Sequence, residues 1–134
     1  MIPEFNEQDY SPPGIHQATL KEVIERFGVQ SEVRQVQAES QQWLMPLCRE
    51  AGISRVLING SFVTDVLDPN DVDCVLLQGP NYRSTSKIAR QIRKGLPFLE
   101  IRTVGQAEFD YFAQAVFASD REFVPKGLIE VHFD

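Results

Sequence analysis

The sequence is poor in cysteine, in histidine and in positive charge, and each shortage excludes a class of site. Its 134 residues include two cysteines and two histidines, which form no zinc-binding cluster of recognisable spacing. The formal net charge of −6 at pH 7 argues against attraction of the whole surface to nucleic-acid phosphates. A local basic patch is compatible with this total, and a group of cation-binding carboxylates would contribute to it.

Long apolar runs are also missing. No stretch approaches the roughly 18 uninterrupted apolar residues of a membrane-spanning helix. The N-terminal stretch MIPEFNEQDYSPPG has neither the basic nor the apolar region of a secretion signal. Cys48 and Cys74 lie in patterns of buried residues, as expected for free thiols in a reducing compartment. We therefore expect a cytoplasmic protein with no membrane association.

The composition that is present is that of a globular protein, with 43% hydrophobic and 24% charged residues. The length suits one compact domain. Residues 1–18 contain three prolines and show no sustained periodicity, so they are predicted to be an irregular lead-in. A single domain is expected over residues 19–134.

Hydrophobic periodicity and turn residues predict an alternation of helices and strands. The expected helices are 20–27, 31–51, 62–67, 83–95 and 106–117, and the expected strands are 55–58, 71–78, 98–104 and 127–133. This order predicts an α/β (α+β) domain, in which helices pack on one side of a mixed sheet of about four strands. Pro46 is expected to kink or split the long helix, and Trp43 is expected in its buried stripe.

The most informative stretch joins the first two expected strands. The first strand runs into Gly60 and Ser61, and the second begins with Asp71 and Asp73. Glycine permits a sharp turn and the close approach of a phosphate to backbone N–H groups. A helix that starts at Ser61 would direct its unpaired N–H groups at that phosphate. The hydroxyls of Ser61 and Thr64 would add two further donors.

The two aspartates are separated by one residue, so in a strand they project to the same face. Neighbouring carboxylates repel each other unless a cation lies between them. Oxygen ligands of this kind, together with triphosphate oxygens, suit Mg²⁺ or Mn²⁺. Such metals stabilise the attacking and leaving oxygens of an in-line displacement at phosphorus.

This stretch resembles the signature of the polymerase-β-like nucleotidyltransferase superfamily: Gly-Ser, a spacer, then Asp-hydrophobic-Asp-hydrophobic on a strand. The spacer is the nine residues 62–70, and the resemblance covers roughly residues 54–104. The chain is similar in length to the minimal nucleotidyltransferases of bacterial toxin–antitoxin pairs. The resemblance implies that Gly60 and Ser61 hold the β- and γ-phosphates and that Asp71 and Asp73 bind the metal ions.

The superfamily usually carries a third carboxylate between apolar residues on a later strand. The segment Leu-Glu-Ile at 99–101 has this form, so Glu100 is the expected third metal ligand. Glu130, in Ile-Glu-Val at 129–131, has the same form and is an alternative. The resemblance thus implies transfer of a nucleoside monophosphate, AMP from ATP, to a hydroxyl of a partner protein or of an RNA 3′ end, in a toxin–antitoxin setting.

Other interpretations stay open. The fold can persist without catalysis, as a binding module that neutralises or regulates a partner protein by contact. A stripe of basic residues on the helix expected over 83–95 is either a solvated face or a docking face for RNA, an acidic partner or the triphosphate. Its members are Arg83, Lys87, Arg90 and Lys94. A chain this short has no separate domain to grip a polymer, which favours a protein partner or a homo-oligomer that completes the acceptor site.

Overall fold

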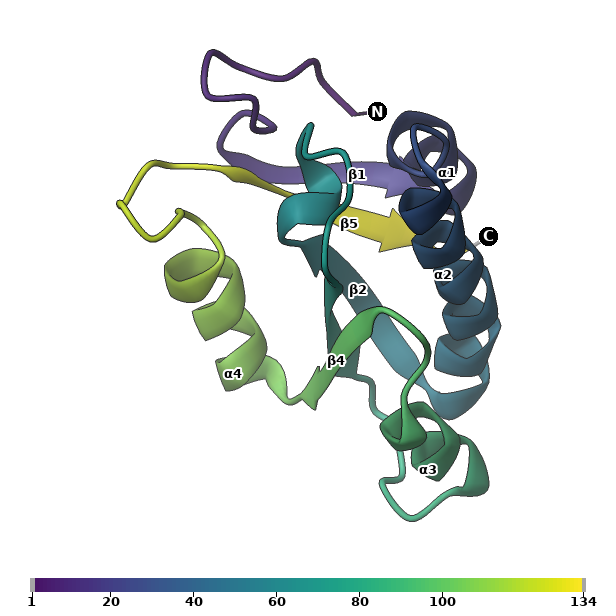
Figure 1. Cartoon of the computed structure of the whole chain (residues 1–134). Coiled ribbons are helices and arrows are strands. Elements are labelled where there is room, and N and C mark those ends of the chain that lie inside the picture. The colour runs from purple at the N-terminus through teal and green to yellow at the C-terminus, as the bar shows by residue number, and fades with distance from the viewer. Residues whose placement is uncertain (1, 134) are drawn as a thin grey trace.

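The computed structural model describes residues 2–133, which form a sheet with helices on both of its faces (Figure 1). The strands are β1 (Gly14–Thr19), β2 (Ile53–Asn59), β3 (Val72–Gln78), β4 (Leu99–Val104) and β5 (Gly127–His132). The helices are α1 (Leu20–Phe27), α2 (Glu32–Ala51), α3 (Lys87–Lys94) and α4 (Gln106–Tyr111). A 3₁₀ turn, Ser61–Val63, follows β2, and a π-helical segment, Phe112–Val116, continues α4. No helix in this described part of the chain is long and apolar enough to cross a membrane.

The sheet is mixed, with the strand order β1-β5-β2-β3-β4. Strand β2 runs antiparallel to β3 and β5, whereas β1 is parallel to β5 and β4 is parallel to β3. The predicted α/β (α+β) class is therefore confirmed. The sheet has five strands instead of about four because β1 lies partly in the expected lead-in. Half of β1 is exposed and only Ala18 is buried, so it lacks the apolar alternation that marks a strand, and its pairing with β5 defines it.

The expectation that all helices pack on one side is wrong for α4. Helices α1, α2 and α3 cover one face of the sheet, and α4 with its π-helical extension covers the other (Figure 1). In β3, Cys74 and Leu76 point to the α2 face, and Val75 and Leu77 point to the α4 face. A strand that is apolar at consecutive positions needs both of its faces covered, which requires a helix on each side.

Helix α2 is continuous through Pro46, so the expected split does not occur. Ser31 caps its start, and Gly52, at φ 88°, ends it. The prediction of a buried Trp43 is wrong, because that residue is 65% exposed while the adjacent Leu44 is 1% exposed. The stripe predicted from apolar residues differs from the face of α2 that is buried, because several buried positions of α2 are polar. These are Arg34, Gln37, Ser40 and Gln41.

Local signals placed the start of α1 and the end of α2 well. The Thr19 side chain accepts a hydrogen bond from the Glu22 amide, and the Glu22 side chain accepts one from the Thr19 amide, which is the expected capping box at the start of α1. Two expected helices are shorter than predicted. The one over 62–67 is only the 3₁₀ turn, and α3 starts after its cap at Ser86, not at residue 83.

Candidate active site

The turn after β2 lies directly beside one of the expected carboxylates. Gly60 has φ 87°, a backbone conformation that favours glycine. A β-carbon added at this position would lie 2.6 Å from Oδ2 of Asp73. The side chain of Asp73 therefore projects toward the Gly60–Ser61 turn, as the motif predicts.

Asp73 also has a carboxylate neighbour on the adjacent strand. Strands β3 and β4 are parallel, with Asp73 in register with Glu100, so the two side chains share the α4 face of the sheet. The pKa of Asp73 is raised to about 6, first because burial disfavours its charged form and second because Glu100 repels it. The two carboxylates fit the chemistry of a divalent cation, since a cation bound between them would relieve this repulsion.

Asp71 lies one residue before β3 and is exposed. In the described part of the chain, no three His, Cys, Asp or Glu side chains come close enough to form a metal-binding group. Asp71, Asp73 and Glu100 are thus not gathered as a three-ligand set, although Asp73 and Glu100 are neighbours. Their roles as metal ligands stay predictions.

The alternative third carboxylate, Glu130, is engaged elsewhere. It is buried and accepts two hydrogen bonds from Arg55, at 3.1 Å from Nε and 2.5 Å from Nη2. It is in register with Leu57 of β2, whereas Asp73 is in register with Asn59. Of the two alternatives, Glu100 is therefore the one beside Asp73.

An arginine that the sequence did not single out for the site bonds to both carboxylates. Nη2 of Arg102 lies 2.9 Å from Oε1 of Glu100, and Nη1 lies 3.9 Å from Oδ1 of Asp73. The guanidinium also lies over the rings of Phe112 and Phe117. Residues 100 and 102 of a strand share a face, and this alternation is the sequence signal that could have found Arg102. Arg102 acts as an internal counter-ion of the carboxylate pair.

A half-buried lysine adds positive charge at the same end of the sheet. Lys126 comes directly before β5, and Asp73 and Asp120 both attract its ammonium group. No carboxylate of the described residues lies within 4 Å of this group, so it forms no direct ion pair. Burial lowers the pKa of Lys126. It is a cation near Asp73 that sequence reasoning missed.

The loop that carries the turn is fixed by one buried side chain, Arg34 of α2, which is 2% exposed. Its guanidinium is surrounded by backbone carbonyl groups, and it has no carboxylate partner within 4 Å in the described residues. It donates to the carbonyl oxygens of Phe27 (2.9 Å), Ser61 (3.3 Å), Phe62 (2.7 Å), Thr64 (2.8 Å) and Val66 (2.9 Å). The fork geometry of the guanidinium allows this many bonds from one group.

Two further side chains hold the same loop, one from the N-cap of α2 and one from α2 itself. Ser31 donates to the carbonyl oxygen of Leu67 at 2.9 Å, and Gln37 donates to that of Pro69 at 2.7 Å. The hydroxyl of Thr64 donates to the Ser61 carbonyl at 2.7 Å, so it is engaged within the loop. Its expected contact with a phosphate stays a prediction, whereas the Ser61 side chain is exposed.

Asn59 is a buried polar residue directly before the turn. It is 2% exposed, it stands opposite Asp73, and its Oδ1 has no hydrogen-bond partner among the described residues. Buried polar atoms are normally bonded. The Asn59 Oδ1 is therefore a buried acceptor beside Asp73 that lacks the usual hydrogen bond among the described residues.

The expected basic stripe is only partly helical. Lys87, Arg90 and Lys94 lie on α3, whereas Arg83 belongs to the turn before it, and all four are exposed. A docking role for RNA or an acidic partner stays a prediction.

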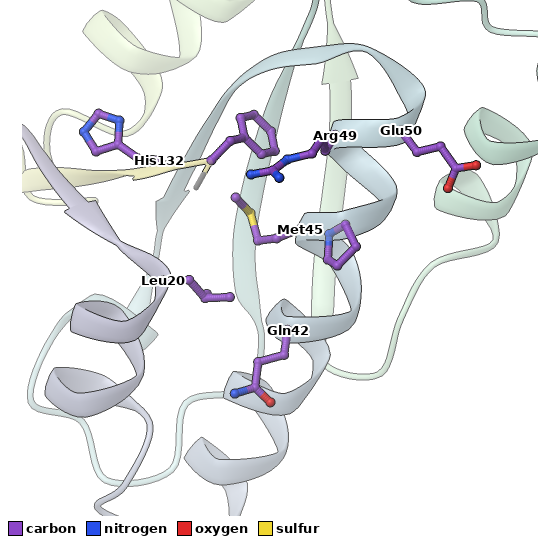
Figure 2. Close-up of a pocket in the computed structure, with 8 residues that line it drawn as sticks. Leu20, Gln42, Met45, Arg49, Glu50 and His132 are labelled. Carbon is purple, nitrogen blue, oxygen red and sulfur yellow. The ribbon is translucent and has the colours of Figure 1, made fainter.

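Two hollows of the molecule differ in their position relative to the expected site residues. The one shown in Figure 2, of about 400 Å³, lies between α2, the start of α1 and the end of β5, and contains none of the expected site residues. Its lining includes Met45, Pro46 and His132. A second hollow, of about 590 Å³, runs along β4 and borders Glu100. The site at Gly60 and Asp73 is therefore identified by its polar groups and not by the hollow in Figure 2.

A family model described as a family of unknown function, DUF6932, matches residues 3–132. The chain belongs to the DUF6932 family. No curated protein and no solved structure matches this DUF6932 chain. Its function must therefore be argued from its own site.

Proposed function

We propose that this DUF6932 chain is a metal-dependent nucleotidyltransferase that transfers a nucleoside monophosphate, AMP from ATP, to a hydroxyl group. The observation that carries the proposal is the position of Asp73, with its carboxylate beside Gly60 of the Gly-Ser turn and next to Glu100 on the neighbouring strand. The resemblance to the polymerase-β-like superfamily rests on the same residues. The register of β3 and β4 supports it, because that register brings residues 27 positions apart (73 and 100) side by side.

Asp73 and Glu100, with Asp71 from the segment before β3, would hold Mg²⁺ or Mn²⁺. Such an ion, when bound, polarises the α-phosphate and stabilises the acceptor oxygen as it loses its proton. The backbone N–H groups of Ser61 and Phe62 and the exposed Ser61 hydroxyl would bind the leaving pyrophosphate, whereas the amides of Val63 and Thr64 already donate within the turn. Arg34 keeps this turn in place, and Lys126 supplies positive charge near Asp73.

A second function, a non-catalytic binding module, is favoured by one observation. Arg102 already pairs with both carboxylates, as expected if the pair only stabilises the fold. In the enzyme, Asp73 would hold the metal ion in place of Arg102, because the 3.9 Å separation of Arg102 Nη1 from Asp73 Oδ1 makes that ion pair weak. The two functions therefore predict different effects of removing Arg102.

The test measures the binding of Mg²⁺ and ATP to the purified chain by calorimetry. A second readout is the transfer of label from α-labelled ATP to proteins of a lysate. The variants D71A, D73A and E100A are expected to weaken binding of Mg·ATP by roughly tenfold or more, since each loses a charged ligand. Glu108→Ala, which removes an exposed carboxylate of α4, is the matched control. Arg102→Ala should bind Mg²⁺ at least as well as the native chain.

The proposal fails if the native chain binds Mg·ATP no better than D73A does. In that case, retention of the biological effect in D73A would establish the binding module. As part of the proposal we place the protein in the cytoplasm, with a partner protein or an RNA 3′ end as acceptor. Cys48 and Cys74 are both free and buried, which is in accord with that placement.

A further inference from the structure

Strand β4 forms an open edge of the sheet, because its only strand neighbour among residues 2–133 is β3. The Phe98 carbonyl oxygen accepts a hydrogen bond from the Val72 amide of β3 at 2.8 Å. Backbone groups of alternate residues in a strand point to opposite edges. Those of Leu99, Ile101 and Thr103 therefore point away from β3, toward the open edge, where the Leu99 N–H already donates to the Leu96 carbonyl oxygen at 3.2 Å.

A cleft of about 590 Å³ follows this edge. Its lining includes Leu99, Ile101 and Thr103, the three residues with outward backbone groups, together with Glu100. The facing side is formed by α3 and by the segment before it, and includes Tyr82, Ser84 and Arg93. Figure 1 shows β4 beside α3 at this edge of the molecule. An unpaired strand edge next to a cleft can accept a further strand.

The charge of the cleft wall indicates what such a strand would carry. Arg93 lines the cleft, and Arg90 and Lys94 are exposed on the same helix. No acidic residue of α3 offsets them, since the helix sequence is KIARQIRK. Arg93 is therefore the charged group that α3 presents to the cleft, and an acidic side chain of the added segment would complement it.

We propose that the acceptor of the transfer reaction is an extended, acidic polypeptide segment that adds to β4 as a further strand and presents a hydroxyl side chain to Glu100. This inference rests on the proposed function. In an added strand, the side chain opposite Glu100 lies on the same face as Glu100 and Asp73, within about 5 Å. Its neighbours in sequence point to the α3 face, where Arg93 binds an acidic side chain. A peptide backbone matches the alternating N–H and C=O groups of β4, which RNA does not.

The acceptor hydroxyl oxygen forms a bond to the α-phosphorus of ATP, and the bond between this phosphorus and the oxygen that bridges to the β-phosphate breaks. That oxygen leaves with the pyrophosphate at the Gly60–Ser61 turn. The hydroxyl proton passes to the Glu100 carboxylate and from there to solvent. The products are an AMP–peptide ester and pyrophosphate.

The probe is a fluorescent random copolymer of glutamate and tyrosine, which supplies acidic and hydroxyl side chains in an extended chain. Thr103→Pro removes one outward N–H group, and proline is tolerated on an edge strand whose N–H faces outward. We expect it to weaken probe binding by roughly three- to tenfold. Thr103→Val keeps the N–H group and should bind the probe as the native chain does. Arg93→Glu should weaken binding, whereas Lys21→Glu, the same charge change on α1, should not.

Hydrogen exchange on the native chain provides a readout that needs no variant. Addition of the probe should slow exchange of the Ile101 and Thr103 amides and leave the amides of β1, the other edge strand, unchanged. The inference is overturned if Thr103→Pro binds the probe as tightly as Thr103→Val, if the protection falls on β1, or if the native chain does not bind the probe. Tight, salt-dependent binding of single-stranded RNA that competes with the probe would establish an RNA acceptor in its place.

Failure of this inference is distinguishable from failure of the proposed function. Thr103→Pro should bind Mg·ATP normally, whereas D73A should lose ATP but keep the probe. If the native chain binds the probe at β4 and does not bind ATP, then the proposed function fails while the strand-addition surface stands. If it binds ATP but not the probe, the acceptor inference alone fails.

Discussion

Gly60 and Asp73 are so close that there is no space for a β-carbon between them. A methyl group at residue 60 would lie 2.6 Å from Asp73 Oδ2, and the φ of 87° is unfavourable for any other residue. Gly60→Ala should therefore displace Asp73 or the turn, and reduce the affinity for Mg·ATP by roughly tenfold or more. Gly105→Ala, where a β-carbon meets nothing within 4 Å, should bind as the native chain does. Equal binding by both variants would contradict a phosphate site at this turn.

The backbone carbonyl groups around Arg34 form a cage. We therefore predict that this side chain stabilises the turn without contact with a ligand. Arg34→Lys keeps the charge but has too few donors for the five carbonyl groups, so buried acceptors are left without partners. We expect a loss of roughly 2–4 kcal/mol in the free energy of unfolding, measured with urea. Hydrogen exchange of the amides over 61–66 should accelerate more than that of α1. Arg26→Lys, a change at a partly exposed arginine, should cost far less. A small loss for Arg34→Lys would show that the cage is not required.

The raised pKa of Asp73 predicts a specific pH dependence of stability in a metal chelator. Its folded-state value of about 6 lies above the ordinary value of 3.8, so the folded chain binds the proton more tightly than the unfolded chain. The stability from this group is fully present below pH 3.8 and is lost as pH rises through about 6. Asp73→Asn, which stays neutral, should therefore be more stable than the native chain at pH 8, by at most about 3 kcal/mol.

This difference between Asp73→Asn and the native chain should shrink as the pH is lowered from 8 through 6. Urea denaturation at a series of pH values measures it. Glu108→Gln provides the matched control, because Glu108 is exposed and its replacement should give a pH-independent difference near zero. A native chain that is more stable than Asp73→Asn at pH 8 would show that Arg102 and Lys126 outweigh burial and the repulsion by Glu100.

Trp43 provides a test of the observed orientation of α2, since it is the only tryptophan in the chain. With 65% of its surface exposed, its fluorescence should be quenched by acrylamide almost as efficiently in the folded as in the unfolded protein. Trp43→Gln should change the free energy of unfolding by less than about 1 kcal/mol. Leu44→Ala, at the adjacent buried position, should cost about 2–5 kcal/mol. Strong protection of the Trp43 fluorescence would place this residue in an interface.

The elements that the sequence predicted well are those whose signals are local. The capping box of Thr19 and Glu22 sets the start of α1, and Gly52 sets the end of α2, because each cap is made by residues within one turn of the helix end. The order of the Gly-Ser turn and the aspartate strand is likewise a feature of one continuous stretch. For this reason the α/β class and the two halves of the site, Gly60 and Asp73, are readable from residue types and spacing.

The features that the sequence did not reveal depend on residues far apart in the chain. Strand β1 exists through its pairing with β5, more than 100 residues later (14 with 127). Trp43 and Leu44 are neighbours with opposite environments, and only the packing of α2 on the sheet decides which one is buried. Glu100 and Glu130 have the same local form, and only the strand register and the engagement of Glu130 with Arg55 show that Glu100 is the one beside Asp73.

The sequence by itself determined the capping box of α1, the end of α2 at Gly52, the turn at Gly60 and the face shared by Glu100 and Arg102, because these follow from backbone geometry over a few residues. Only the tertiary structure decided that Arg34 holds the turn, that Arg102 and Lys126 lie near Asp73, and that β4 has an open edge. The physical reason is that hydrogen bonds and charges act between groups that are close in space. The fold of the whole chain determines which groups are neighbours in space.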